Sequence, residues 1–169
     1  MQIRIKGVMG TFEPGIIKLL EGKNFASFVT LLSDGSPHVA PTWIDHEEDI
    51  VLINTALGRL KEKNVRKDPR VALSIYDNEN PYHMLAVRGK VVEVTTDGAE
   101  THIDKLAKRY LGMDKYPRRS PDEKRILIKI KAEKIHHQDY SWIFSLTFSW
   151  LDLNNSLKEN ILNKKNLEN

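Results

Sequence analysis

The sequence contains no cysteine among its 169 residues. This absence excludes a disulfide scaffold, thiolate zinc sites, iron–sulfur clusters and a cysteine nucleophile. The chain also lacks a run of the roughly 20 apolar residues that a membrane-spanning helix needs. Residues 1–15 have no apolar core of the kind found in a signal peptide. We therefore expect a cytoplasmic protein with no membrane partner.

Positively and negatively charged residues are nearly balanced. The chain has 26 lysines and arginines against 23 acidic residues, for a net charge of +3. A protein that coats nucleic acid usually carries a larger positive excess, so we expect no nucleic-acid partner. The six histidines show no metal-ligand spacing, and none of the common nucleophile, zinc-protease, phosphate-loop or dinucleotide motifs occurs. The sequence thus predicts no metal site and identifies no catalytic residue.

Residues with β propensity alternate with turn signals along most of the chain. Hydrophobic residues make up 40% of it, enough for the core of one domain. The pattern predicts a mainly β fold with short helices, and six antiparallel strands that form a closed or nearly closed barrel. We expect strands at 25–32, 37–44, 49–54, 70–76, 82–95 and 126–136, and helices that begin near Glu13 and cover 59–67 and 97–111.

The first two strands form a predicted hairpin around Asp34-Gly35, a pair that favours a two-residue type I′ turn. In that register Leu32 faces Pro37 and Phe28 faces Pro41, and both prolines fall in non-hydrogen-bonded pairs. The missing N–H groups then interrupt the ladder on the outer side of the strand, where a flat ligand can approach the backbone. Protection of an edge strand explains the prolines equally well.

The segment after the third strand is basic where a helix should begin. Thr55 can cap a helix start, yet Arg59, Lys61 and Lys63 occupy the first turns. Cations oppose the helix dipole there, so helix stability does not explain them. A bound anion such as a phosphate would be held by backbone N–H groups, the dipole and basic side chains together. The alternative is a solvated basic helix.

The end of the chain differs in composition. Residues 140–151 place serines one helical turn apart in an apolar run, and the residues after them are rich in asparagine and lysine. We expect a domain at 1–139, and a C-terminal extension at 140–169 that consists of an apolar helix and a frayed tail.

Several short segments, in order and spacing, resemble the flavin-binding split β-barrel proteins related to pyridoxamine 5′-phosphate oxidase. Within them the chain looks most like the branch of deazaflavin (coenzyme F-420)-dependent oxidoreductases. The matching segments are residues 33–39 (SDGSPHV), 54–64, 68–72 (DPRVA), 80–82 (NPY), 87–91 (VRGKV) and 103–112.

This resemblance implies a homodimer with two cofactor sites at the subunit interface, FMN or coenzyme F-420 as cofactor, and a small-molecule substrate. Thr55, Arg59 and Lys61 would hold the cofactor phosphate, with Asn54 beside them. The strand residues that would run beneath the ring are His38, Val39, Ala40, Pro41 and Thr42. The C-terminal motif that holds substrate in true pyridoxamine phosphate oxidases has no counterpart here, so that specific activity is not expected.

The leading hypothesis is an oxidoreductase that transfers hydride between a flavin or deazaflavin and a small organic substrate. A non-catalytic FMN-binding or carrier protein of the same fold is the alternative. A basic barrel that binds nucleic acid is a third candidate, but its strands lack the aromatic platform on which single-strand binders stack bases.

Overall fold

The computed structural model describes residues 12–140, and the predicted helix and tail beyond them lie outside the described residues. The chain divides into two units, Met1–Gln138 and Asp139–Asn169. The first unit holds the described helices and nearly the whole sheet. The predicted division into a domain and an extension stays a prediction.

Seven strands form one sheet in the order β2-β1-β5-β6-β7-β4-β3. The strands are β1 (Ala26–Leu31), β2 (Pro37–Thr42), β3 (Asp45–Glu47), β4 (Ile50–Ala56), β5 (Arg70–Tyr76), β6 (His83–Thr95) and β7 (Arg125–Asp139). Each pair with a defined register is antiparallel. The mainly β class is confirmed, but the six-stranded count is wrong. β2 and β3 are the ends of this sheet, which does not close on itself through a further strand pair.

The additional strand is β3, where the sequence predicted only a turn. Its three residues pair with the start of β4, Asp45 opposite Leu52 and Glu47 opposite Ile50. Asp45 is 1% exposed, and a charged residue at such depth gives no strand signal in the sequence. It is stabilised by ion pairs with Lys105 and Arg109.

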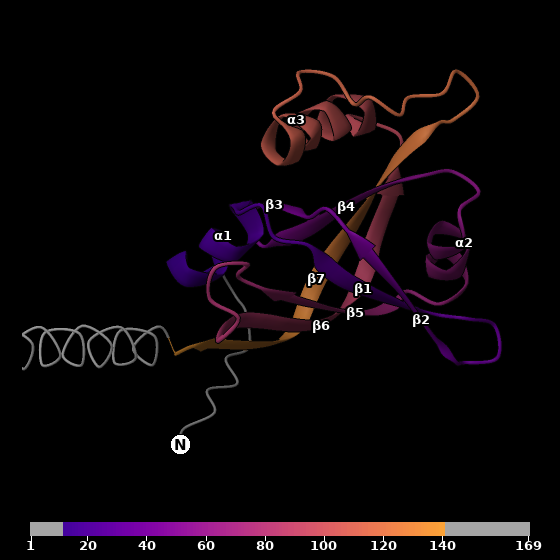
Figure 1. Cartoon of the computed structure of the whole chain (residues 1–169). Coiled ribbons are helices and arrows are strands. Elements are labelled where there is room, and N and C mark those ends of the chain that lie inside the picture. Colours follow the sequence, from indigo (N-terminus) through magenta and orange to yellow (C-terminus); the bar gives the residue numbers. More distant parts are fainter. Residues whose placement is uncertain (1–11, 141–169) are drawn as a thin grey trace, which may run out of the picture. The chain divides into compact units, whose positions relative to one another are not determined.

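Three helices accompany the sheet: α1 (Pro14–Glu21), α2 (Leu60–Lys67) and α3 (Ala99–Leu111). Figure 1 shows α1 on the left, α2 on the right and α3 above the strands, and both α1 and α2 contribute side chains to one core. Helix α1 packs against β3, β5 and β6, α2 against β1, and α3 against β4. No helix within residues 12–140 is long and apolar enough to cross a membrane.

The core lies on the inner face of the sheet, and β4 is buried on both faces. Along β5, residues alternate between exposed and buried positions, as expected for a strand with one covered face. In β4, by contrast, every residue from Val51 to Ala56 is buried, because α3 covers the second face. The largest fully buried side chains are Phe28, Leu19, Leu20, Ile44, Ile53, Ile75, Leu85, Leu106, Ile126, Ile128, Ile130 and Val51.

The first hairpin is shifted by one residue from the predicted register. Leu31 pairs with Pro37 and Ser27 with Pro41. The Leu32 N–H donates to the Ser36 carbonyl at 2.9 Å, which leaves three residues in the loop, and Gly35 takes a φ of +83°. Because hydrogen-bonded and non-bonded pairs alternate from Leu32, both prolines still fall in non-bonded pairs. The predicted turn type is therefore wrong, while the position of the prolines on the outer side of the strand is retained.

Candidate functional site

Helix α2 begins at Leu60 with Arg59 as its N-cap residue, and Glu62 caps its first turn. The Gly58 N–H donates to Glu62 Oε2 at 3.0 Å, and the other carboxylate oxygen of Glu62 pairs with Arg66. Glu62 sits three residues after the N-cap and reaches back to the preceding backbone, as in a capping box. Thr55 lies within β4 and is not the cap, contrary to the sequence interpretation.

Lys61 is the half-buried cation of this segment, whereas Lys63 and Lys67 are exposed. Its side chain is half-buried, and no ion pair joins it to another residue of the described part of the chain. Burial lowers the pKa of Lys61, and the nearby guanidinium groups of Arg59 and Arg125 lower it further. An ammonium group held among like charges would be stabilised by a bound anion.

Arg59 and Arg125 share one counter-ion, Glu123. Arg59 Nη2 lies 2.7 Å from Glu123 Oε2, and Arg125 Nη1 lies 2.6 Å from Glu123 Oε1. We call Arg59, Lys61, Arg125 and Glu123 the basic cluster. Three cations face a single carboxylate, so the cluster keeps a positive excess even with its ion pairs formed.

Asn54 holds the buried side of the basic cluster. Its Oδ1 accepts hydrogen bonds from Arg125 Nε at 2.9 Å and Nη2 at 2.6 Å. Its Nδ2 donates to the Ala99 carbonyl at 2.8 Å and to His102 Nδ1 at 3.3 Å. Two accepted and two donated hydrogen bonds fill the capacity of an amide side chain. Asn54, expected from the resemblance to lie beside the cofactor phosphate, is placed to position Arg125.

Thr55 points to the other face of β4, because successive residues of a strand alternate. It is 1% exposed, and its Oγ1 has no hydrogen-bond partner among residues 12–140. A buried hydroxyl without a partner costs free energy relative to a hydrogen-bonded one. The structure therefore separates Asn54 from Thr55, and of the two only Thr55 has unused hydrogen-bonding capacity, on a buried hydroxyl.

A series of side-chain hydrogen bonds links α2 to β2. Asn64 Nδ2 donates to Thr30 Oγ1 at 3.0 Å, and Thr30 Oγ1 lies 3.5 Å from His38 Nδ1. Lys61 and Asn64 are three residues apart on α2 and therefore share a side of the helix. This arrangement connects Lys61, predicted to hold a phosphate, with His38, predicted to lie beneath a ring.

The predicted ring-side residues of β2 divide between two faces. By strand alternation, His38, Ala40 and Thr42 share one face, and Thr42 is buried. Val39, 58% exposed, and Pro41 point the other way. β2 is an end strand of the sheet, so its outer backbone edge pairs with no strand of the described chain.

An aromatic contact joins the end of β2 to the basic cluster. Trp43 follows Thr42 directly, and its ring meets Tyr116 edge-on with centroids 5.9 Å apart. The Arg125 guanidinium carbon lies 5.3 Å from the centre of the Tyr116 ring. Arg125 was not among the predicted site residues, because it precedes an alternating apolar and lysine strand and gives the same signal as an exposed basic residue. No local sequence pattern distinguished three further residues from ordinary strand, helix and loop residues: Thr30, Asn64 and Tyr116.

Comparison with known proteins gives the class to which this fold and site belong. The family model described as pyridoxamine 5′-phosphate oxidase matches residues 12–139. The chain belongs to this family, as the resemblance predicted. Among curated protein sequences, none matches the chain.

Solved structures give more specific likenesses. A protein described as "F420 Reductase" is 28% identical, with a TM-score of 0.63; the match covers 72% of this chain and 95% of that one. The conserved hypothetical protein Rv2991 from Mycobacterium tuberculosis is 19% identical, with a TM-score of 0.60, over 82% of this chain and 90% of that one. General Stress Protein 26 from Bacillus anthracis is 22% identical, with a TM-score of 0.55, over 74% and 92%. The last two likenesses show the fold alone.

Proposed function

We propose that the protein is an oxidoreductase that binds FMN or coenzyme F-420 and transfers hydride between that cofactor and a small organic substrate. The observation that carries the proposal is Lys61, a half-buried ammonium without an acidic partner in the described chain. Membership of the pyridoxamine 5′-phosphate oxidase family and the likeness to an F420 reductase support this choice of cofactor.

The residues present fit the anionic part of such a cofactor. Lys61 and Arg59 offer charge-assisted contacts to a phosphate, and the unpartnered Thr55 hydroxyl offers a neutral one. Arg125 is held by Asn54 and Glu123, so its charge contributes through the local field. The chain thus supplies a positive site in which Arg59 and Arg125 are already fixed by protein contacts.

The ring of the cofactor would lie along β2, where Pro37 and Pro41 leave only the Val39 N–H pointing to the outer edge among residues 37–41. The cofactor supplies the hydride chemistry when bound, while the protein binds and orients it. In this proposal His38 is held on the ring side by its contact with Thr30, which Asn64 in turn fixes from α2. A homodimer with the cofactor at the seam remains an expectation from the resemblance.

The test is to purify the full chain and record absorbance spectra during stepwise addition of FMN and of coenzyme F-420. We expect saturable spectral changes with at least one of them. The chemically reduced, bound cofactor is then mixed with small quinones and nitroaromatic compounds, and we expect oxidation faster than that of the free cofactor. Binding without this acceleration would support the non-catalytic carrier, and no binding would contradict the proposal.

A further inference from the structure

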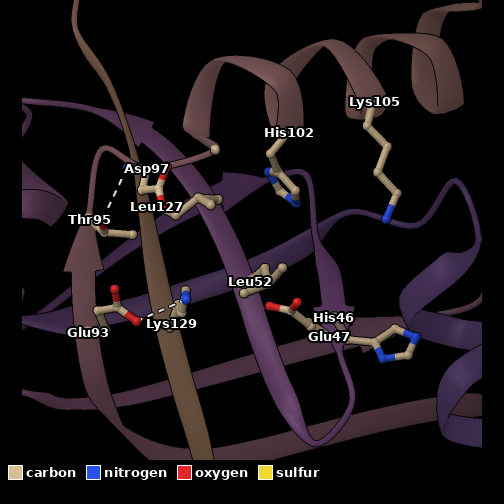
Figure 2. A pocket seen from close by; sticks show the side chains of 11 residues that line it. His46, Glu47, Leu52, Glu93, Thr95, Asp97, His102, Lys105, Leu127 and Lys129 are labelled. Carbon is tan, nitrogen blue, oxygen red and sulfur yellow. Dashed lines mark hydrogen bonds and ion pairs between the residues drawn. The ribbon is translucent and has the colours of Figure 1, made fainter.

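A cavity lies on the side of the sheet covered by α3, and none of the proposed cofactor-binding residues lines it. Its volume is about 370 Å³. Figure 2 shows it between the first turns of α3 and the strands β3, β4, β6 and β7. The lining residues are His46, Glu47, Leu52, Glu93, Thr95, Asp97, Gly98, His102, Lys105, Leu127 and Lys129.

The walls of this cavity differ in charge. His102 and Lys105 project into it from α3, whereas Glu47 and Glu93 come from the strands opposite (Figure 2). Leu52 and Leu127 form an apolar floor between the two walls, and each is 6% exposed. An elongated ligand that binds across the floor would meet donors at one end and carboxylates at the other.

Two carboxylates of the cavity lack an ion pair within the described part of the chain. Glu47 and Asp97 form no ion pair with any residue in the described range 12–140, although Lys129 lies within their electrostatic reach. Lys129 is already paired with Glu93, Nζ to Oε2 at 2.9 Å. The pKa of Lys129 is raised by its hydrogen bond to Glu93 and also by Glu47 and Asp97. The strand wall carries Glu47 and Glu93 against the single cation Lys129, so it would accept a ligand ammonium group. Asp97 lies after β6, beside the start of α3 (Figure 2).

The α3 wall has hydrogen-bond donors that the described residues do not use. Lys105 Nζ gives one hydrogen bond to Asp45 Oδ2 at 2.5 Å, which leaves further N–H groups on an ammonium that has three. Asn54 Nδ2 donates to His102 Nδ1, so the ring proton of a neutral His102 is on Nε2. That Nε2 lies 3.3 Å from Asp45 Oδ2 but makes no hydrogen bond with acceptable geometry to the described residues. The start of α3 also favours negative charge.

We propose that this cavity binds a small zwitterion of the α-amino acid type, with its ammonium group against Glu47 and its carboxylate against Lys105 and His102. A simple diamine would place its second charge against Lys105, and a dicarboxylate would place one against Glu47. The apolar floor accommodates an aliphatic or aromatic side chain.

The experiment uses calorimetry and thermal shift on the full-length protein with each of the twenty free α-amino acids. Each binder is compared with its decarboxylated amine and with its deaminated acid. We expect at least one amino acid to bind, and loss of either charged group to weaken binding about tenfold or more, as expected for a charge-assisted contact. If no amino acid binds at about 10 mM, a concentration that detects millimolar affinities, the proposal is wrong.

Three variants test the orientation of the ligand. Glu47→Gln removes a charge from the strand wall and should weaken binding several-fold, while Lys129→Met removes the competing cation and should strengthen it. Glu79→Gln, at an exposed position outside the cavity, is the matched control and should have no effect. If Glu47→Gln instead strengthens binding and Lys129→Met weakens it, the cavity prefers anions, and equal effects of Glu47→Gln and Glu79→Gln would show that the ligand binds elsewhere. Either result would overturn the proposal.

Discussion

Arg125 donates two hydrogen bonds to a single oxygen of Asn54, from Nε at 2.9 Å and from Nη2 at 2.6 Å. Both side chains are buried, Arg125 at 5% exposure and Asn54 at 6%. The bonds fix the guanidinium at the inner side of the basic cluster and fix which way the amide faces. With Oδ1 committed to Arg125, Nδ2 is directed to the Ala99 carbonyl and His102, so one residue ties β7, β4 and α3 together.

Replacement of Asn54 by alanine should therefore reduce stability more than it reduces cofactor affinity directly. The variant leaves the Arg125 guanidinium and the Ala99 carbonyl without their buried partners, at a cost of about 2–4 kcal/mol in the free energy of unfolding. Urea denaturation followed by circular dichroism measures this loss. A variant as stable as the parent protein would show that these hydrogen bonds do not hold the cluster.

Thr55→Val separates a ligand contact from a structural one. Valine keeps the shape of threonine and removes a hydroxyl that has no partner in the described chain, so the free energy of unfolding should stay the same or rise. Cofactor affinity should fall by up to about tenfold, the value of one neutral hydrogen bond.

Thr30→Val is the matched control for this change, because the Thr30 hydroxyl accepts a hydrogen bond from Asn64. That variant should lose stability. If Thr55→Val also destabilises the protein and leaves cofactor affinity unchanged, the hydroxyl has a structural role and not a binding role.

Asp104 makes the attachment of the α3–β7 loop dependent on pH. Burial is the largest single influence on its carboxyl and raises the pKa, but three donors together outweigh it and lower the pKa of Asp104 to about 2. The donors are the Tyr116 N–H, Lys115 Nζ and Arg119 Nη2. A carboxyl group whose pKa is lower in the folded state stabilises the fold at pH values above its unfolded-state pKa. This stabilisation is lost as the pH falls through the folded-state pKa.

We therefore expect the parent protein to exceed Asp104→Asn in stability by a constant amount above about pH 5, and the difference to shrink between about pH 4 and pH 2. Urea midpoints measured at intervals of pH give the result. A difference that persists unchanged to pH 2 would contradict the ionic role of this carboxylate.

The subunit arrangement expected from the resemblance is tested by mass in solution. Sedimentation velocity should give about twice the 19.5 kDa of one chain, with and without cofactor. A monomer that binds FMN or coenzyme F-420 with full affinity would show that one chain contains the whole site.

Much of the fold can be predicted from local sequence signals. The strand at 70–76 begins directly after Asp68-Pro69, and its exposed and buried residues alternate, so its limits agree with the prediction. β3 could not be predicted, because it has three residues and its buried Asp45 is stabilised by α3, far away in the sequence. The predicted hairpin register was wrong for a local reason. Asp34-Gly35 fits a two-residue turn that needs a positive φ at both residues, but of the two only Gly35 takes one.

The candidate site was predictable only where a residue broke a local rule. Lys61 was predicted to bind an anion because a cation at a helix start is unfavourable. The structure shows it without an acidic partner in the described chain. Asn54 and Arg125 are 71 residues apart, and their contact depends on the pairing of β4 with β7. No local pattern indicates such a contact, so the sequence analysis left Arg125 out and assigned Asn54 to the ligand.

The most direct test of the proposed cofactor site is titration of FMN, coenzyme F-420 and riboflavin against the parent protein, Lys61→Met and Lys63→Met. Lys63 is exposed and lies on α2 about half a turn from Lys61, so its variant removes the same charge from the other side of the helix. We expect Lys61→Met to weaken binding of the phosphate-bearing cofactor by about ten- to a hundredfold, and Lys63→Met to leave it nearly unchanged. Riboflavin, which lacks the phosphate, should bind weakly to all three proteins, and the stability of Lys61→Met should equal or exceed that of the parent. Equal affinities of Lys61→Met and the parent protein for both FMN and coenzyme F-420 would contradict the account.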